Sequence, residues 1–317
     1  MATVEEVARE VVASIDTTAG YLLASRWVSN RYRQLCSRSR FRHLRKLGEV
    51  ILPAPIDSGT ATATNGSRTV TGDATAQTAW TPSVVGRYFR TRTAWYKIVA
   101  VVGGALRLDT TFAEDTTSSA SYTIIERRVR LPKDVRWLGE TFVHYRLRRP
   151  LDRLSLIEMD YRHPERQLVG TPPCYWADAG VDVDTDGHQV RVVEFYPISD
   201  QDELLAFVYW SIPPELALTD EIPTTIDPYV LKEGALIDAM RYEMGRALNA
   251  VQLDVAAHWR NEYRAQSTAW ERNIIEAIRT DRGADDVTFI LESARGGPYA
   301  TDIVNARDQI FSQGNRP

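Results

Sequence analysis

Apolar residues recur with helical spacing at both ends of this chain, whereas the long stretch between the ends carries strand and turn patterns. Thr3 and Glu6 form a capping-box pattern at the start of an apolar helical stripe that runs from Val4 to Ile15. Near the other end, Asp227 and Pro228 are typical of a helix N-cap and a first helical residue. A helix with one apolar face must bury it against another element, so we expect the two ends to pack together.

The stretch between the helical ends is organised as strands and turns. Threonines alternate with other residues on both sides of Asn65-Gly66, which is the typical two-residue turn of a β-hairpin. Further strands are expected at 88–92, 95–102, 105–109 and 122–128 and, beyond Pro132, at 141–147, 154–159, 189–196 and 203–210. The pattern therefore predicts two antiparallel β modules.

These segments predict an α+β fold: a helical bundle formed by the N- and C-terminal segments, interrupted by inserted antiparallel β-barrel or sandwich modules and followed by an extended C-terminal arm. The expected boundaries are 1–50 and 227–281 for the discontinuous bundle, 51–130 for a small barrel-like module, 131–226 for a second β module and 282–317 for the arm. The second helix is expected to end before Pro53 and the last one near Gly283. Gly234, Ala235 and Ala239 form a small-residue face that lets another helix approach closely.

The composition limits the class of protein. With 44% hydrophobic and 25% charged residues, the chain resembles an ordinary globular protein, and its longest apolar run, from Ile98 to Leu106, is too short to span a bilayer. Cys36 and Cys174 lie in different predicted modules, so no disulfide framework is expected and a reducing compartment fits. The first residues carry acids and lack a signal-peptide pattern. We therefore expect synthesis in the cytoplasm and no membrane anchor.

Charge is sorted along the sequence, although the formal net charge is only −4. The segment 26–46 contains eight Arg or Lys and no acid, 127–166 contains eleven bases and six acids, and 177–227 contains twelve acids and one base. One interpretation is a solvated surface on which like charges happen to cluster. The other is a ring of identical subunits in which a basic face meets the acidic face of the next copy. Candidate contacts for such a ring are Arg146, Arg148, Arg149, Asp182, Asp184 and Asp186.

The sequence contains no pattern typical of catalysis or of a bound cofactor. The five histidines are scattered, and no zinc-ligand spacing, nucleophile elbow, phosphate loop or dinucleotide fingerprint is present. Asp182, Asp184, Asp186 and Gly187 match the start of a calcium loop, but Val193 occupies the position of the bidentate acid. An Asp-Gly turn is therefore favoured over a metal site. We expect no catalytic, cofactor-binding or metal-binding residues and no enzymatic activity.

The basic segment 26–46 also raises the question of DNA binding, because Trp27, Tyr32 and Phe41 are interleaved with its arginines. No signature of a nucleic-acid-binding fold accompanies these residues. Contact with protein, or plain solvation, is favoured over sequence-reading recognition of DNA.

Three stretches of the sequence together resemble the head-to-tail connector adaptors of tailed bacteriophages, also called head completion proteins. They are the Thr-rich hairpin SGTATATNGSRTVTG with the strands after it, the stretch from GTPPCYWADAG through VRVVEFYPISD to FVYWSIPPELALTDEIPT, and IDPYVLKEGALIDAMRYE with its trailing helix. The resemblance covers most of the chain and depends on the order of these stretches, since none of them is a catalytic signature.

The resemblance implies a structural virion protein that forms a ring of twelve copies beneath the portal protein. Such a ring extends the DNA channel and is the attachment platform for the tail, or for the next stopper or nozzle protein, with tail fibres as further candidate partners. DNA then passes without sequence-specific binding, so the basic segment 26–46 is expected to contact protein and not to line the channel. The implied location is the neck of the virion, after synthesis in the cytoplasm of the host bacterium.

In this family the C-terminal segment reaches toward the portal. The resemblance therefore places the portal-contacting residues in the arm, at Val287, Phe289, Ile290, Leu291, Tyr299, Ile303, Ile310 and Phe311.

Two other classes of function stay open from the sequence. A receptor- or carbohydrate-binding protein associated with the tail or its fibres would use the β modules and exposed aromatic residues such as Trp176 and Trp210. A hydrolase is disfavoured because no nucleophile or metal pattern is present.

Overall fold

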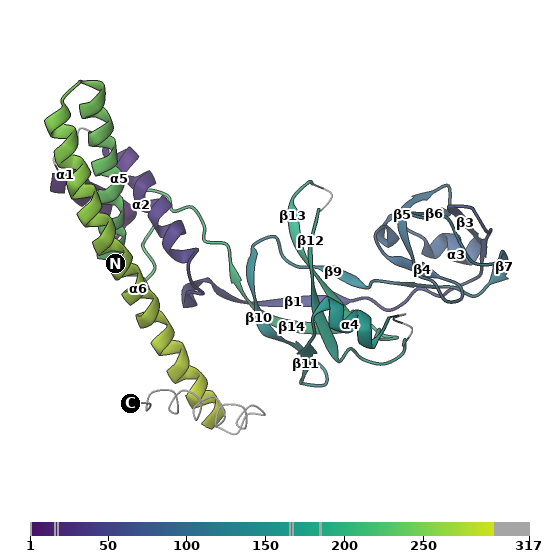
Figure 1. Ribbon diagram of the computed structural model, residues 1–317. Coiled ribbons are helices and arrows are strands. Elements are labelled where there is room, and N and C mark those ends of the chain that lie inside the picture. Colours follow the sequence, from purple (N-terminus) through teal and green to yellow (C-terminus); the bar gives the residue numbers. More distant parts are fainter. Residues whose placement is uncertain are drawn as a thin grey trace. The chain divides into compact units, whose positions relative to one another are not determined.

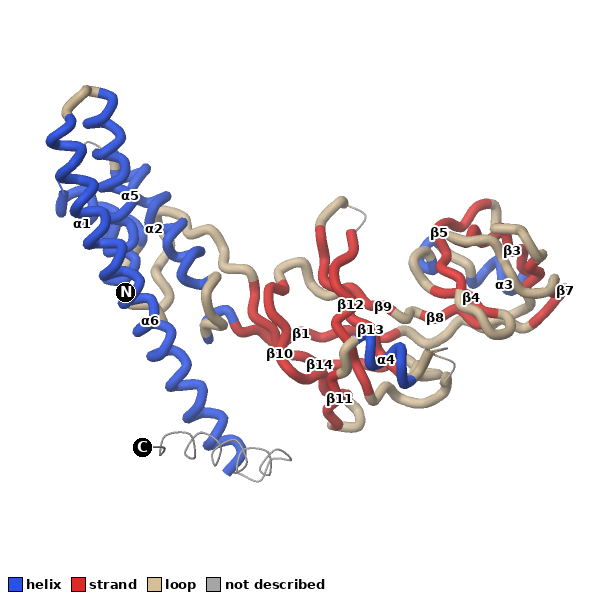
Figure 2. Tube along the Cα trace, viewed as in Figure 1, coloured by secondary structure: helices blue, strands red, loops and turns tan. Residues whose placement is uncertain are grey.

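The computed structural model describes residues 2–294 except positions 16, 18, 165, 167, 184 and 185. The chain divides into two compact units. The first, which we call the helical unit, combines Met1–Arg45 with the chain from Ile212 onward, and the second, the β unit, is Lys46–Ser211. Figure 1 labels the elements of both units, and Figure 2 separates their helices from their strands.

The helical unit brings together segments from both ends of the chain. It contains α1 (Val4–Ile15), α2 (Tyr21–Cys36), the 3-10 helix η1 (Arg42–Leu44), α5 (Pro228–Asn249) and α6 (Leu253–Ala294). Helices α1 and α2 pack on each other and on α5, and α5 packs along α6 as a helical hairpin (Figure 1). Each of the first three helices buries an apolar face, with Val7 and Val11 from α1, Leu35 from α2 and Leu231 from α5 in the core.

The helix starts predicted from the sequence are confirmed. Glu6 donates its backbone N–H to Thr3 Oγ1 at 3.2 Å, and Thr3 donates its own to Glu6 Oε2 at 2.8 Å, which completes the capping box of α1. Asp227 accepts a hydrogen bond from the backbone N–H of Tyr229 at 2.9 Å, and Pro228 is the first residue of α5. Both caps satisfy N–H groups that a first helical turn leaves unpaired.

One of the two sheets of the β unit has the strand order β1-β14-β10-β11-β12-β13-β9. Its strands are β1 (Arg45–Leu52), β9 (Arg128–Arg130), β10 (Val135–His144), β11 (Arg149–Arg153), β12 (Tyr175–Val183), β13 (Gln189–Tyr196) and β14 (Glu203–Ser211). Helix α4 (Leu156–Arg162) lies in the connection between the parallel strands β11 and β12. The core is aromatic, because the ring of Phe142 lies 4.8–5.1 Å from the rings of Trp176, Phe195 and Phe207.

The other sheet has the strand order β7-β2-β3-β6-β5-β4-β8. Its strands are β2 (Ala61–Ala63), β3 (Thr69–Gly72), β4 (Tyr88–Arg90), β5 (Tyr96–Val102), β6 (Ala105–Leu108), β7 (Thr117–Ala120) and β8 (Thr123–Ile125), with α3 (Ala74–Ala79) and the 3-10 helix η2 (Pro82–Val84) between β3 and β4. The predicted hairpin at Asn65-Gly66 is confirmed, because β2 and β3 pair antiparallel and Gly66 has a φ of 79°.

The predicted fold class is wrong. The described residues are organised mainly by two large curled seven-stranded sheets, one close to a closed barrel and the other a half-barrel, together with six α-helices, and not as a helical bundle carrying small inserted modules. Three segments show why the pattern misled. Helix α2 ends at Cys36 and is followed by strand β1, residues 156–162 form a Ser155-capped helix where a strand is expected, and α6 runs beyond Gly283 to Ala294, into the segment expected to be an extended arm.

None of the described helices is long and apolar enough to cross a membrane.

Candidate functional site

Half of the bases in the segment 26–46 pair with acids of the same chain. Half of its eight bases make an ion pair in which both partners belong to one unit: Arg31 with Asp238, Arg38 with Glu271, Arg42 with Asp281, and Lys46 with Asp134. The first three pairs join α2 and the residues after it to α5 and α6. Three bases of this segment therefore help to hold the helical unit together.

Arg31 is the most enclosed of these bases, with 8% of its surface exposed. Its Nε and Nη2 atoms both lie 2.7 Å from the Asp238 carboxylate, and its guanidinium group lies 4.4 Å from the centroid of the Trp270 ring. Trp270 in turn donates its indole N–H to the backbone oxygen of Val230 at 3.1 Å. This clamp ties α2, α5 and α6 to one another.

A hollow of about 470 Å³ lies beside this clamp, on the same three helices. Its lining is aromatic and charged, with Trp27, Gln34, Arg241, Tyr263 and Glu271 around the clamp residues. Arg241 donates to the Tyr263 hydroxyl at 2.8 Å and thereby lowers the pKa of that phenol. The polar groups of the hollow are thus partly engaged with each other.

The small-residue face predicted on α5 is confirmed at Gly234. A Cβ atom at this position would lie 2.7 Å from Trp270 Nε1 and 3.2 Å from Arg31 Cδ. Only glycine leaves room for the clamp, because real Cβ atoms do not approach neighbours that closely.

We expect Gly234→Ala to lower the free energy of unfolding by roughly 1–3 kcal/mol, because the added methyl group overpacks the contact between Trp270 and Arg31. Gly245 is the matched control, since it lies in the same helix and a Cβ there meets nothing within 4 Å. Gly245→Ala is expected to stabilise by roughly 0.5–1 kcal/mol through helix propensity. Urea unfolding followed by tryptophan fluorescence measures both, and equal effects of the two variants would contradict the close packing.

His43 is the centre of a second cluster in the helical unit. Its Nε2 atom lies 3.1 Å from the Tyr32 hydroxyl and 3.8 Å from Cys36 Sγ, and its Nδ1 atom lies 2.7 Å from Thr225 Oγ1. Burial lowers the pKa of His43 to about 4 and raises the pKa of Tyr32. The imidazole is therefore neutral at pH 7 and links α2 to the segment before α5, with no acid among these partners to charge it.

The His43 cluster is expected to make the folded state less stable in acid. The unfolded chain takes up a proton on His43 near pH 6.5, whereas the folded chain does so only near pH 4, so the stabilisation is complete above pH 6.5 and is lost as the pH falls toward 4. Between pH 7.5 and 5 we expect a loss of roughly 2 kcal/mol from this group. Urea unfolding at several pH values should show it, and a His43→Gln variant with an unchanged pH dependence would contradict the assignment.

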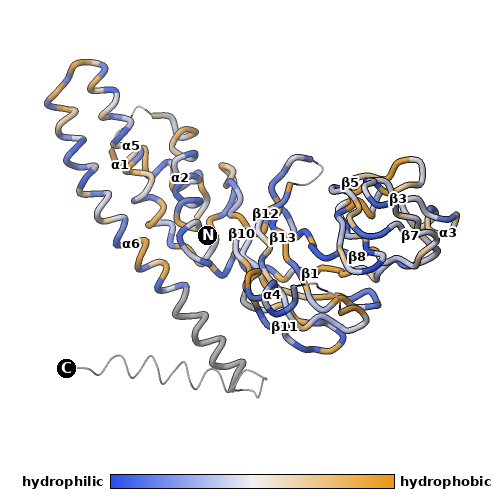
Figure 3. The backbone as a smooth tube through the Cα atoms, turned by 45° about the vertical axis from the view of Figure 1, so that its right-hand side comes forward, coloured by the Kyte–Doolittle hydropathy of each residue, from blue (hydrophilic) through white to orange (hydrophobic). Residues whose placement is uncertain are grey.

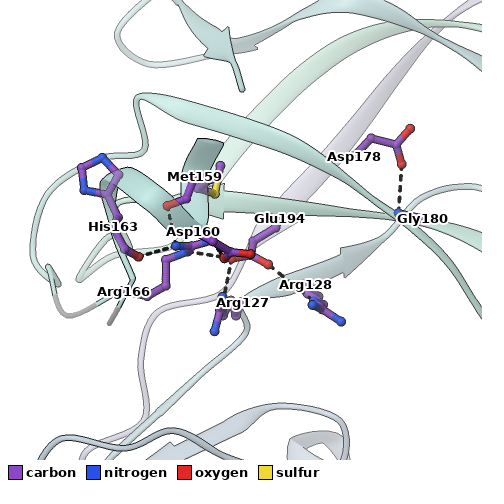
Figure 4. Close-up of polar contacts among 9 residues, drawn as sticks. All are labelled: Arg127, Arg128, Met159, Asp160, His163, Arg166, Asp178, Gly180 and Glu194. Carbon is purple, nitrogen blue, oxygen red and sulfur yellow. Dashed lines mark hydrogen bonds and ion pairs between the residues drawn. The ribbon is translucent and has the colours of Figure 1, made fainter. Parts of the chain in front are cut away.

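The β unit contains a buried ionic network centred on Glu194 in β13, whose side chain is fully enclosed. Arg127 and Arg166 approach one carboxylate oxygen with their Nε atoms at 2.7 and 2.9 Å, and Arg128 approaches the other at 3.5 Å. Figure 4 shows the three guanidinium groups around this single carboxylate. The acid is thus satisfied from strand β9, from the residue just before it and from the segment after α4.

Arg166 connects this network to helix α4. It is 1% exposed, donates to the backbone oxygens of Met159, at 2.7 Å, and His163, and reaches the Asp160 carboxylate at 2.5 Å (Figure 4). One side chain therefore neutralises Glu194 and caps the end of α4. No sequence motif predicts this role of Arg166. The only indication is the excess of bases between 127 and 166.

A second buried acid of the β unit, Glu203, pairs with Arg146, which is one of the predicted ring contacts. Its carboxylate lies 2.8 Å from His144 Nε2, accepts the Ser199 hydroxyl at 2.9 Å and lies 3.2 Å from Arg146 Nη2. His144 Nδ1 accepts the backbone N–H of Leu147 at 3.1 Å. His144 therefore lies between the Glu203 carboxylate and the turn that joins β10 to β11.

The remaining predicted ring contacts lie at turns and strand ends. Asp182 pairs with Arg130 at 2.9 Å, and the hydrogen bond from Arg130 lowers the pKa of Asp182. Asp186 pairs with Lys133 at 3.0 Å. Arg148 occupies the β10–β11 turn with a φ of 48°, Arg149 is exposed at the start of β11, and Asp184 lies outside the described residues.

The basic and acidic blocks of the sequence thus pair with each other within one chain. Acids of 177–227 pair with bases of 127–166 because β13 lies beside β9 and β14 lies beside β10. These pairs do not test whether the exposed members also contact a second copy, which stays a prediction.

The predicted portal contacts lie at the C-terminal end of the chain. Val287, Phe289, Ile290 and Leu291 belong to helix α6. Tyr299, Ile303, Ile310 and Phe311 lie outside the described residues.

The aromatic residues proposed for glycan binding are less accessible than expected. Trp176 is fully buried in the core of its sheet, so its assignment as an exposed aromatic is wrong, and Trp210 is half-buried. Among the residues described, no group of three or more His, Cys, Asp or Glu is arranged to hold a metal ion.

No family model matches the chain. A local similarity of 29% identity over 84 residues relates it to N-(5'-phosphoribosyl)anthranilate isomerase of Pseudomonas fluorescens (strain Pf0-1). The aligned stretch is 26% of this chain and 41% of that enzyme, so the chain spans less than half of the relative's length. A match this short and this distant assigns neither a family nor an activity.

Proposed function

We propose that this protein is a structural component of the neck of a tailed-bacteriophage virion. In this proposal it is an adaptor that forms a ring beneath the portal, extends the DNA channel and gives the tail or the next neck protein its attachment platform. Its partners are further copies of itself, the portal protein and the protein docked below, and DNA passes through without sequence-specific contact.

The observation that carries the proposal is the division of the chain into two units, one of which is assembled from both chain ends. An adaptor needs one body for the portal and another for the component below it. The helical unit, which contains the long helix α6, suits the first role, and the contiguous β unit Lys46–Ser211 suits the second.

The ion pairs made by the basic segment 26–46 support the same proposal. A channel that lets DNA slide should carry few fixed cations, because each phosphate that a protein neutralises adds a salt-sensitive attachment. Four of the eight bases of this segment are paired with acids of the chain, three of them inside the helical unit. These ion pairs lower the number of unpaired cations that the segment could present to DNA.

The test is to mix the purified chain with cognate portal rings and to image the product by electron microscopy. A rotationally symmetric cap on the portal is the expected result, and portal rings that stay bare under conditions where the chain is folded would overturn the proposal. A variant with Ile310→Ser and Phe311→Ser is expected to lose portal binding with an unchanged Tm. Leu22→Ser, which changes an exposed residue of α2, is the matched control.

A further inference from the structure

The turn between α5 and α6 contains a residue in an unfavourable conformation. The backbone N–H of Val251 bonds to the oxygen of Leu248 at 3.1 Å, and that of Gln252 bonds to the oxygen of Ala247 at 2.9 Å. These two bonds form a Schellman motif, in which Val251 occupies the left-handed position with a φ of 58°. Glycine is the usual residue there, and a β-branched side chain is strained in this conformation.

The strained side chain is also strongly exposed. Val251 is 77% exposed and Leu253 is 66% exposed, and Leu248 and Val255 on either side are exposed as well. Figure 3 shows the hydrophobic colouring of the tube at this turn. We call these four residues the knob. Neither burial nor backbone geometry within the chain favours valine over glycine at position 251, so the side chain is best explained by a contact outside the chain.

The same helical hairpin carries a hollow near its other end. This hollow has a volume of about 270 Å³ and lies where the first turn of α5 faces the middle of α6. Tyr229, Val230 and Ala277 are the apolar residues of its lining, and its polar residues are Thr225, Asp227, Asn273, Glu276 and Thr280. Tyr229 is exposed at its rim. Along α5 the hollow is about 30 Å from the knob, at 1.5 Å per residue. A cavity of about 150 Å³ already accepts a benzene molecule, so the hollow has room for aliphatic side chains.

We infer that the knob of one copy inserts into the hollow of the next copy. A protrusion and a recess at opposite ends of α5 make a head-to-tail interface, which closes into a ring when the rotation between copies allows it. The inference rests on the proposed function, because it supplies the contact between neighbouring subunits of the ring. It also differs from the charge contacts predicted from the sequence, because the residues involved are apolar and belong to the helical unit.

The decisive variant is Val251→Gly, which relieves the strain and removes the apolar side chain at once. At a concentration where both proteins are monomeric we expect the Tm of the variant to be about 2 °C higher, while its apparent Kd of self-association, measured by sedimentation velocity, rises about tenfold or more. Leu22→Ser, an exposed leucine outside the knob, should leave self-association unchanged. Wild-type protein that is monomeric at every concentration, or a Val251→Gly variant that associates normally, would overturn the inference.

A cross-linking experiment tests the pairing of knob and hollow directly. In a Cys174→Ser background, which removes the half-exposed native thiol, a chain carrying both Val251→Cys and Ala277→Cys has its two new thiols too far apart to join within one copy, so oxidation should give a ladder of covalent oligomers. Each single variant should give at most dimers, and a double variant that behaves like the single variants would count against this pairing.

Portal binding is scored separately by electron microscopy. Loss of the ladder with portal binding intact would reject the knob contact alone, and a ladder without portal binding would reject the proposed function alone.

Discussion

Replacing Glu194 by leucine is expected to lower the free energy of unfolding by about 3–5 kcal/mol, because the change leaves the buried guanidinium group of Arg166 with only the exposed Asp160 carboxylate as its acidic partner. Arg127 is mostly buried beside the same acid and also loses its partner. The cost arises from uncompensated buried charge and not from lost packing, since leucine retains most of the apolar volume. Urea unfolding followed by tryptophan fluorescence measures it, with Trp176 in the adjacent core as a reporter.

Two further variants isolate the cause. Glu158→Ala removes an acid that pairs with Arg162 at the surface of α4, and it should change stability by less than about 0.5 kcal/mol. The double variant Glu194→Leu with Arg166→Met removes the charges of this pair and should recover part of the loss. A single Glu194→Leu variant as stable as Glu158→Ala would show that the network is solvated in solution.

Replacing Arg31 by methionine is expected to destabilise the helical unit by about 3 kcal/mol. The change leaves the Asp238 carboxylate largely enclosed and without its two hydrogen bonds, and it removes the cation from the face of Trp270. Methionine keeps the length of the side chain, so the lost charge dominates the effect. Thermal and urea unfolding of the full chain, read by circular dichroism at helical wavelengths, report the loss.

Arg38 offers a control within the same helix-to-helix contact. Arg38 follows the end of α2 and pairs with Glu271 of α6, and its guanidinium group lies 5.8 Å from the centroid of the same Trp270 ring. Both side chains of this ion pair are substantially exposed. Arg38→Met should therefore cost only about 0–1 kcal/mol. If the two arginine variants were equally destabilised, burial would not be the property that makes the Arg31 clamp strong.

The features that the sequence predicts correctly are those encoded by neighbouring residues. The capping box at Thr3 and Glu6, the start of α5 at Asp227 and the hairpin at Asn65-Gly66 each depend on a few adjacent positions, and each is present. Gly234 is a similar case, because a glycine on a helix face signals a close approach whichever side chain fills the space. Local backbone chemistry alone is enough to specify such elements.

The features that the sequence does not predict depend on residues far apart in the chain. The pairing of β13 with β9 places Glu194 beside Arg127 and Arg128, more than sixty positions away, and no spacing rule connects them. Strand β1 comes soon after the basic helix α2, so the sequence predicts that the helix continues through it. In the structure β1 lies beside β14, and its residues alternate between exposed and buried. The fold class here depends on the size of the sheets and on the order of their strands. The periodicity of residues within one segment specifies neither property.

The assembly of the helical unit from both chain ends also sets an order for folding during synthesis. The β unit is contiguous, so it can complete its sheets once Ser211 has left the ribosome, whereas α1 and α2 must wait for α5. During that interval the apolar faces of α1 and α2, with Val7, Val11 and Leu35, have no partner helix from the other end to cover them. Nascent chains stalled before residue 228 should therefore be the form of this protein most prone to aggregation and to capture by chaperones.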